Sequence, residues 1–157
     1  MKQKTCSFTG HRQLPAEKLN KIKRQTLSAI EELIKKGVTN FICGGALGYD
    51  TLCAQAVLFL KTRYEGIRLT IAIPCEGQSR YFSNNEKKLY DEILDRADER
   101  VYVSREYFAG CMHKRNRYMV DNSAYLIAYC TRTSGGSYYT KEYAKRNNVT
   151  VIEITAG

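Results

Sequence analysis

Two glycine-rich stretches could hold an anion through their main-chain N–H groups. They are "GGALGYD" (44–50) and "TRTSGGS" (131–137), and each follows an apolar run. Glycine ahead of a helix lets the chain turn sharply and leaves main-chain N–H groups free to hold an anion. The two stretches therefore predict a site for a phosphate or pyrophosphate group, formed by Gly44, Gly45, Gly48, Gly135 and Gly136.

Arginines accompany these turns and would give the site a positive charge. Arg12, Arg80 and Arg115 each lie in a polar stretch next to a predicted strand or helix end. A guanidinium group binds phosphate through paired hydrogen bonds. The formal net charge of +9 favours an anionic partner, although simple solubility explains it equally well.

Asp50 has two compatible interpretations. It caps the helix that follows, or it accepts hydrogen bonds from a ribose or a base. The complete set of candidate ligand-binding residues is Thr9, Gly10, His11, Arg12, Gly44, Gly45, Gly48, Asp50, Arg80, Arg115, Asn116, Asp121, Ser134, Gly135, Gly136 and Ser137.

Composition excludes several other classes of protein. No apolar run approaches the ~20 residues that a membrane span requires, and "MKQKTCSFTG" (1–10) lacks the apolar region of a signal peptide. The six cysteines form no C-x-x-C pair, and the two histidines have no zinc spacing with them. We therefore expect a cytoplasmic location, no membrane partner, reduced thiols, no metal site and no required cofactor.

Alternating strands and helices must position these side chains. The pattern predicts strands at 4–8, 39–43, 67–73, 100–103, 124–130 and 149–154. It predicts helices at 15–36, from Asp50 or Thr51 to Tyr64, from Ser83 through Ala97, at 112–122 and at about 137–146. The fold expected for 1–157 is one α/β domain: a doubly wound, mostly parallel, Rossmann-like sheet of about six strands with helices on both faces.

The order of elements also predicts where the site lies. The stretches 9–12, 44–50, 74–83 and 131–137 each follow a predicted strand. In a parallel sheet the carboxyl ends of the strands meet at one edge, and ligands bind in the crevice beyond them. We therefore expect these four stretches to surround one ligand.

Four blocks in this order resemble the YpsA-like branch of the SLOG superfamily. They are "SFTGHR", "CGGALGYDTLCAQ", "KRNRYMVDNSAYLIA" and "SGGSYYTKEYA". The superfamily includes the Lonely Guy phosphoribohydrolases and the Rossmann domain of DNA-processing protein A. The resemblance implies a Rossmann-like homodimer that binds a nucleotide-derived ligand of the NAD or ADP-ribose type and acts as its sensor.

The enzymes of the superfamily suggest an alternative function. They carry a P-G-G-x-G-T-x-x-E signature, and here the stretch is "SGGSYYTKE" (134–142). In that interpretation Glu142 and Arg115 would be catalytic residues that cleave the N-glycosidic bond of a nucleoside monophosphate. Tyr138 and Tyr139 replace the third glycine and the threonine, and tyrosine is expected to alter the phosphate-binding turn. A plain ion pair with a neighbouring lysine or arginine is the other role open to Glu142.

Single-stranded nucleic acid is a third possible ligand. "RNR" (115–117) and "GGALGYD" resemble segments of DNA-processing protein A, and the net charge agrees with such a partner. However, the aromatic residues do not alternate with basic ones along one track in the sequence. The sequence therefore favours a small ligand bound by the glycine turns.

Overall fold

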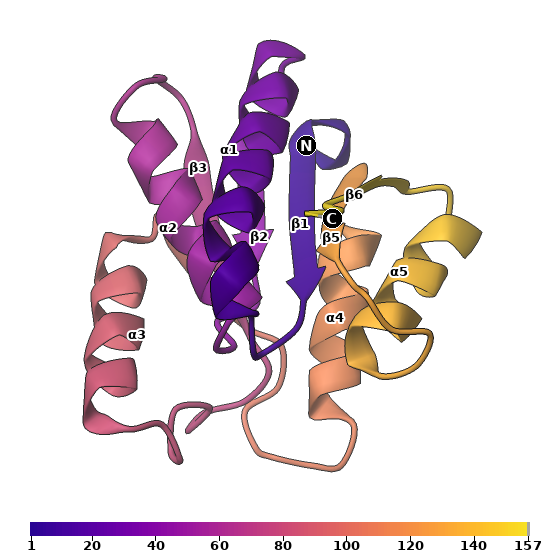
Figure 1. The fold of residues 1–157 in the computed structure, drawn as a ribbon. Helices are drawn as coiled ribbons and strands as arrows, with labels where there is room; N and C mark the ends of the chain where they lie inside the picture. The colour runs from indigo at the N-terminus through magenta and orange to yellow at the C-terminus, as the bar shows by residue number, and fades with distance from the viewer. Residues whose placement is uncertain (157) are drawn as a thin grey trace.

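The computed structural model describes residues 1–156, in which strands and helices alternate as the sequence predicts (Figure 1). The strands are β1 (Thr5–Gly10), β2 (Asn40–Cys43), β3 (Arg68–Ile73), β4 (Glu99–Tyr102), β5 (Tyr125–Tyr129) and β6 (Thr150–Glu153). The helices are α1 (Leu19–Lys35), α2 (Tyr49–Lys61), α3 (Asn84–Arg96), α4 (Cys111–Asp121) and α5 (Gly136–Arg146). Two short 3-10 turns, η1 (Lys2–Lys4) and η2 (Ala16–Lys18), precede β1 and α1.

The strands form one six-stranded sheet in the order β4-β3-β2-β1-β5-β6. Every neighbouring pair is parallel, so all carboxyl ends lie at one edge. The chain winds outward from β1 to β4 and then returns to place β5 on the other side of β1. The strand order therefore reverses between β1 and β5, and the doubly wound Rossmann-like fold is confirmed.

Helices cover both faces of the sheet. The helices α1, α2 and α3 gather on one face, and α4 and α5 lie on the other (Figure 1). The larger apolar cluster lies between the sheet and α1, α2 and α3, while two smaller clusters lie beneath α4 and α5. Side chains alternate along the strands: Phe41 and Cys43 belong to the larger cluster, whereas Ile42 faces α4.

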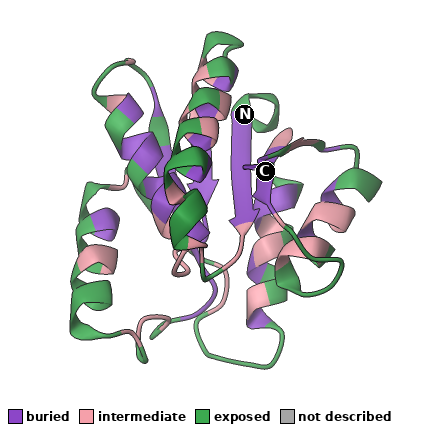
Figure 2. Ribbon diagram, viewed as in Figure 1, coloured by how far each residue is buried: buried purple, intermediate pink, exposed green. Residues whose placement is uncertain are grey.

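The helix α2 is apolar nearly all round, and most of it is buried (Figure 2). It lies in contact with the sheet and packs beside both α1 and α3. By contrast, α3 buries only Ile93 and Leu94, near its C-terminal end. The N-terminal half of α3 is therefore less closely packed than the other helices.

Several element boundaries differ from the prediction by a few residues. The strand expected to end at Phe8 continues to Gly10, because Thr9 and Gly10 pair with β5. The first helix starts as a 3-10 turn at Ala16 and becomes α-helical only from Leu19.

The predicted start of α3 is confirmed. Ser83 Oγ accepts a hydrogen bond from Glu86 N, and Ser83 N donates to the Glu86 carboxylate, at 3.2 and 2.8 Å. This capping box satisfies two main-chain donors at the helix end.

Three findings in the structure concern membrane spans, disulfide bonds and metal sites. Among residues 1–156, no helix has the length and apolar character needed to cross a membrane. Over the same residues the six cysteines are free, and no group of three or more His, Cys, Asp or Glu side chains is placed to hold a metal ion.

Candidate functional site

A cavity of about 500 Å³ lies where the strand order reverses, beyond the carboxyl ends of β1 and β5. We call it the switch-point crevice. Its walls are the segments after β1 and β5 and the first turns of α2 and α4. It is lined by Phe8, Thr9, Gly10, His11, Arg12, Gln13, Ala46, Asp50, Met112, Asn116, Arg132, Ser134, Gly135, Gly136 and Ser137.

The structure brings most of the predicted site residues together in this crevice. Those that line it are Thr9, Gly10, His11, Arg12, Asp50, Asn116, Ser134, Gly135, Gly136 and Ser137. Those that do not line it are Gly44, Gly45, Gly48, Arg80, Arg115, Asp121 and Glu142. Contact of either set with a ligand stays a prediction.

The N-terminus of α5 is open toward the crevice. Gly135 is its N-cap, with φ at 95°, and no side chain caps the helix. A Cβ on Gly135 or Gly136 would meet nothing within 4 Å, and the first turn contains no acidic residue. The free N–H groups and the exposed Arg132 beside them make this end of the crevice suited to an anion.

The two tyrosines that follow do not distort this turn. Tyr138 and Tyr139 lie inside α5, and Gly135 is the residue of the stretch that has a positive φ. The expectation that Tyr138 and Tyr139 would strain the backbone of the phosphate-binding turn is therefore wrong.

The N-terminus of α2 is closed instead. Tyr49 N donates to His11 O at 3.0 Å, and Ala46 N donates to Asp50 Oδ2 at 3.2 Å. Gly48 has φ at 79°, and a Cβ there would lie 2.1 Å from Arg12 O. The segment after β1 thus occupies the place where an anion was expected, and the chain itself requires the glycine.

Arg115 lies behind the crevice rather than in it. Its side chain is 4% exposed. Its guanidinium donates to Gly44 O, to Ala72 O at 3.3 Å and to Asn116 Oδ1 at 2.9 Å. The charge therefore joins the ends of β2 and β3 to α4, and Asn116, which does line the crevice, is held in place by it.

Asp50 is the buried acid next to this arginine. Burial raises the pKa of the Asp50 carboxyl, and the charge of Arg115 and the Ala46 N–H oppose that effect. Burial likewise lowers the pKa of Arg115, with Asp50 opposing it. A Cβ on Gly44 would lie 2.7 Å from Arg115 Nη1 and 2.8 Å from Asp50 Oδ2. Gly44 is therefore needed because these two side chains approach it closely.

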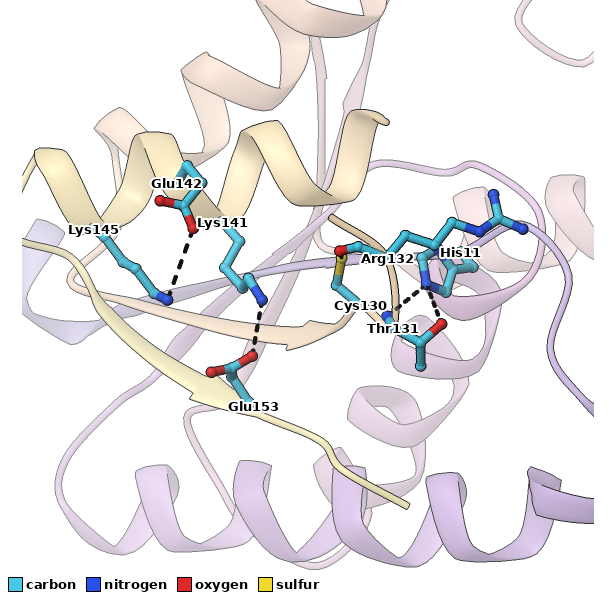
Figure 3. A network of polar contacts seen from close by, with 8 residues as sticks. All are labelled: His11, Cys130, Thr131, Arg132, Lys141, Glu142, Lys145 and Glu153. Atoms are coloured by element: carbon cyan, nitrogen blue, oxygen red, sulfur yellow. Dashed lines mark hydrogen bonds and ion pairs between the residues drawn. The ribbon is translucent and has the colours of Figure 1, made fainter. Parts of the chain in front are cut away.

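His11 joins the two walls of the crevice. Its Nε2 accepts a hydrogen bond from Thr131 N at 2.9 Å (Figure 3), so the ring is neutral with its proton on Nδ1. The ring also packs edge-on against Tyr129, with centroids 5.5 Å apart. Burial, and then the charge of Arg132, lower the pKa of His11 from its ordinary value of 6.5.

Glu142 and Asp121 are engaged elsewhere. The Glu142 carboxylate pairs with Lys145 at 3.9 Å, and Figure 3 shows this pair well separated from His11 and Thr131. Asp121, at the end of α4, accepts a hydrogen bond from the Tyr143 hydroxyl at 2.7 Å. The ion pair considered for Glu142 in the sequence is thus the one observed.

Sequence reasoning missed a second cavity of about 610 Å³. It lies between α2, α3 and the segment after β1, and it shares Arg12, Gln13 and Asp50 with the switch-point crevice. Much of its lining is aliphatic or aromatic, including Leu47 and Leu89. Gly45 and Gly48, two of the predicted site residues, also line it. The sequence signal for its apolar character was a leucine inside the polar turn 44–50, since Leu89 fits the apolar face of a helix equally well.

Comparison with known proteins identifies relatives that match most of this chain. The profile of the YspA SLOG family matches residues 8–155. The SPbeta prophage-derived protein YoqJ of Bacillus subtilis is 34% identical over 139 residues, which cover 80% of this chain and 81% of that protein. A UPF0398 protein of Halalkalibacterium halodurans is 30% identical over 128 residues, covering 80% of this chain and 68% of that protein.

Two solved structures share the fold. DNA processing protein A from Helicobacter pylori, described with its single-stranded DNA binding mode, has a TM-score of 0.66 at 19% identity over 95% of this chain. The same protein from Streptococcus pneumoniae has a TM-score of 0.67 at 17% identity over 97% of this chain. This chain spans only 64% and 50% of those two chains, and the likeness concerns the fold alone.

Replacement of Gly44 should destabilise the protein. Gly44→Ala forces Arg115 and Asp50 apart, and overpacking of this kind costs about 1–3 kcal/mol of unfolding free energy. Gly136→Ala is the matched control, because its Cβ enters open space. Urea denaturation measures both variants, and equal midpoints would contradict the role given to Gly44.

The hydrogen bond of His11 should make stability depend on pH. The folded pKa lies below the unfolded value of 6.5, so this contribution is complete above that pH and is lost as pH falls through the folded pKa. His11→Gln keeps an acceptor for Thr131 N without a titrating ring. We expect the free energy of unfolding to fall less steeply below pH ~6.5 in this variant than in the parent. Parallel curves from denaturation at several pH values would contradict this.

Proposed function

The chain belongs to the YspA SLOG family, and on this premise we propose that it binds a nucleotide-derived ligand of the NAD or ADP-ribose type and acts as its sensor. The single observation that carries the proposal is the open N-terminus of α5 facing the switch-point crevice. Its N–H groups and Arg132 bind a phosphate of the ligand, since a helix N-terminus favours negative charge.

The remaining groups of such a ligand match the two cavities. Asp50 lines both of them, so a sugar placed between phosphate and base can donate a hydroxyl hydrogen bond to its carboxylate. The apolar cavity of about 610 Å³ takes the flat base, because its size and its aliphatic lining are those of small-molecule pockets. Arg12 borders both cavities and supplies a second positive charge to the phosphate.

The phosphoribohydrolase alternative lacks a suitably placed acid. Glu142 pairs with Lys145 and does not line the crevice, and within residues 1–156 Asp50 is the only acidic side chain that does. Hydrolysis of an N-glycosidic bond by Glu142 would require that carboxylate beside the sugar. Ligand binding without turnover is therefore the function that the geometry supports better.

Single-stranded nucleic acid remains the second candidate because of one observation. Tyr81 and Tyr107 are 91% and 71% exposed on loops that follow β3 and β4, at the same edge of the sheet as the crevice. Phe108 follows Tyr107 in the chain, and Lys114 Nζ lies 5.8 Å from the Phe108 ring centroid. Exposed aromatic rings and basic groups bind the bases and phosphates of single strands. The DNA processing protein A of Helicobacter pylori, described as binding single-stranded DNA, shares this fold.

Pairing of two copies into a homodimer and a cytoplasmic location are further parts of the proposal. The first is measured by sedimentation of the purified protein and the second by fractionation of cells. Neither is required for the chemistry of the crevice.

Ligand binding should depend on the first turn of α5. Ser137→Glu places a carboxylate where the phosphate binds, while an acid at a helix N-terminus favours the helix and leaves the fold intact. Ser137→Gln is the matched neutral control. We expect calorimetry to show ADP-ribose or NAD bound at least about tenfold more weakly by Ser137→Glu than by Ser137→Gln. Equal affinities would remove this turn from the site.

Hydrolysis of AMP should be absent or very slow. Release of free adenine, followed by chromatography, is measured for the parent and for Glu142→Ala. Turnover that this substitution abolishes would make the phosphoribohydrolase the leading function instead. Turnover that the substitution leaves unchanged would place catalysis in other residues, with Asp50 the first to test.

A further inference from the structure

A groove lies between α4 and α5, next to the switch-point crevice. We call it the α4–α5 groove; its volume is about 260 Å³, and Asn116 lines both it and the crevice. The binding mode proposed above leaves this groove without a role. Its other principal side chains are His113 and Arg117 of α4 and Tyr139, Tyr143 and Arg146 of α5.

The groove is positively charged and contains no lining acid among residues 1–156. His113, Arg117 and Arg146 come together in it, and in the described structure neither arginine has a carboxylate within ion-pair distance. Glu142, on the same helix, pairs with Lys145 instead. Two arginine side chains without a carboxylate partner attract an anion placed between them.

The groove also presents two aromatic rings. Tyr143 is fixed by its hydrogen bond to Asp121, and Arg117 lies 5.8 Å from its ring centroid. Tyr139 is 56% exposed, and its ring stands against that of Tyr138 with centroids 5.9 Å apart. An exposed ring held by a neighbour is a surface on which a base can stack.

The length of the groove limits what it can hold. From Tyr139 to Arg146 the helix rises about 10 Å, at about 1.5 Å per residue. That length suits one nucleotide unit, with its base against Tyr139 and its phosphate between the basic side chains. A long strand would need the same arrangement to continue along the surface.

From these observations we infer that the α4–α5 groove is a second subsite, which takes an anionic nucleotide unit linked to the one in the crevice. The inference rests on the proposed function and defines its ligand class: two nucleotide units joined through phosphate, with negative charge on the second. A positively charged second unit, such as an oxidised nicotinamide ring, is disfavoured beside the two arginines.

Calorimetry with four adenine nucleotides tests the second subsite. The probes are AMP, adenosine 3′,5′-bisphosphate, the 5′-phosphorylated dinucleotide pApA and a 5′-phosphorylated hexa-adenylate. We expect pApA to bind the parent at least about tenfold more tightly than AMP, with the bisphosphate between them. The bisphosphate separates the contribution of the second phosphate from that of the stacked base.

Substitutions in the groove distinguish its contribution to binding from that of the crevice. Arg117→Gln and Tyr139→Ala should each remove most of the preference for pApA and leave AMP binding unchanged. Lys35→Gln is the matched control, since Lys35 is exposed at the end of α1 and lines neither the groove nor the crevice. It should leave the affinity for both probes as in the parent.

Three results would overturn the inference. If AMP binds and pApA binds no better, the second subsite is wrong and the proposed function stands. If none of AMP, ADP-ribose, NAD and pApA binds, the proposed function fails and the inference with it. If hexa-adenylate binds more than about tenfold more tightly than pApA, with a salt dependence that exceeds two phosphates, the groove belongs to a longer strand-binding track.

Discussion

The buried guanidinium of Arg115 is the interaction on which the rest of the site depends. It occupies the space between the carboxyl ends of β2 and β3 and the first turns of α4, and main-chain carbonyl groups are its principal partners. A buried charge is tolerated only when its hydrogen bonds are satisfied. That requirement excludes a side chain at Gly44, brings Asp50 close and orients Asn116 toward the crevice. The charge thus acts on the ligand site through the positions of other residues.

The two helix N-termini at the sheet edge have opposite characters. The carbonyl group of His11 already accepts from the first N–H of α2, so that end is satisfied by the chain. The first turn of α5 has no such partner and faces the crevice with free donors. The candidate site is consequently asymmetric, with an end suited to an anion at α5 and an apolar end between α2 and α3. Such asymmetry would fix the direction in which a nucleotide lies.

The sequence predicted the fold and the edge of the sheet well, because strand and helix periods and the capping box at Ser83 are local signals. It did not reveal that Arg115 is buried behind the crevice or that the chain itself approaches Gly44 and Gly48 closely, since composition does not show that one part of the chain fills the space beside another. It missed both the apolar cavity and the α4–α5 groove. Each lies between two helices, and whether packed helices leave a gap between them is recorded by no local pattern. Leu89 and Arg117 look in the sequence like ordinary core and surface residues.

The difference between the two glycine turns has a consequence for how this protein can diverge. A side chain at Gly44 or Gly48 would collide with the protein's own atoms, whereas one at Gly136 would meet none. Selection for folding therefore constrains the turn after β2 whatever the ligand is. In the turn after β5 the positive φ of Gly135 favours glycine, but Gly136 is free to change without a clash and so to alter specificity at little cost in stability. New ligand preferences in this architecture would thus arise first in the segment that leads into α5.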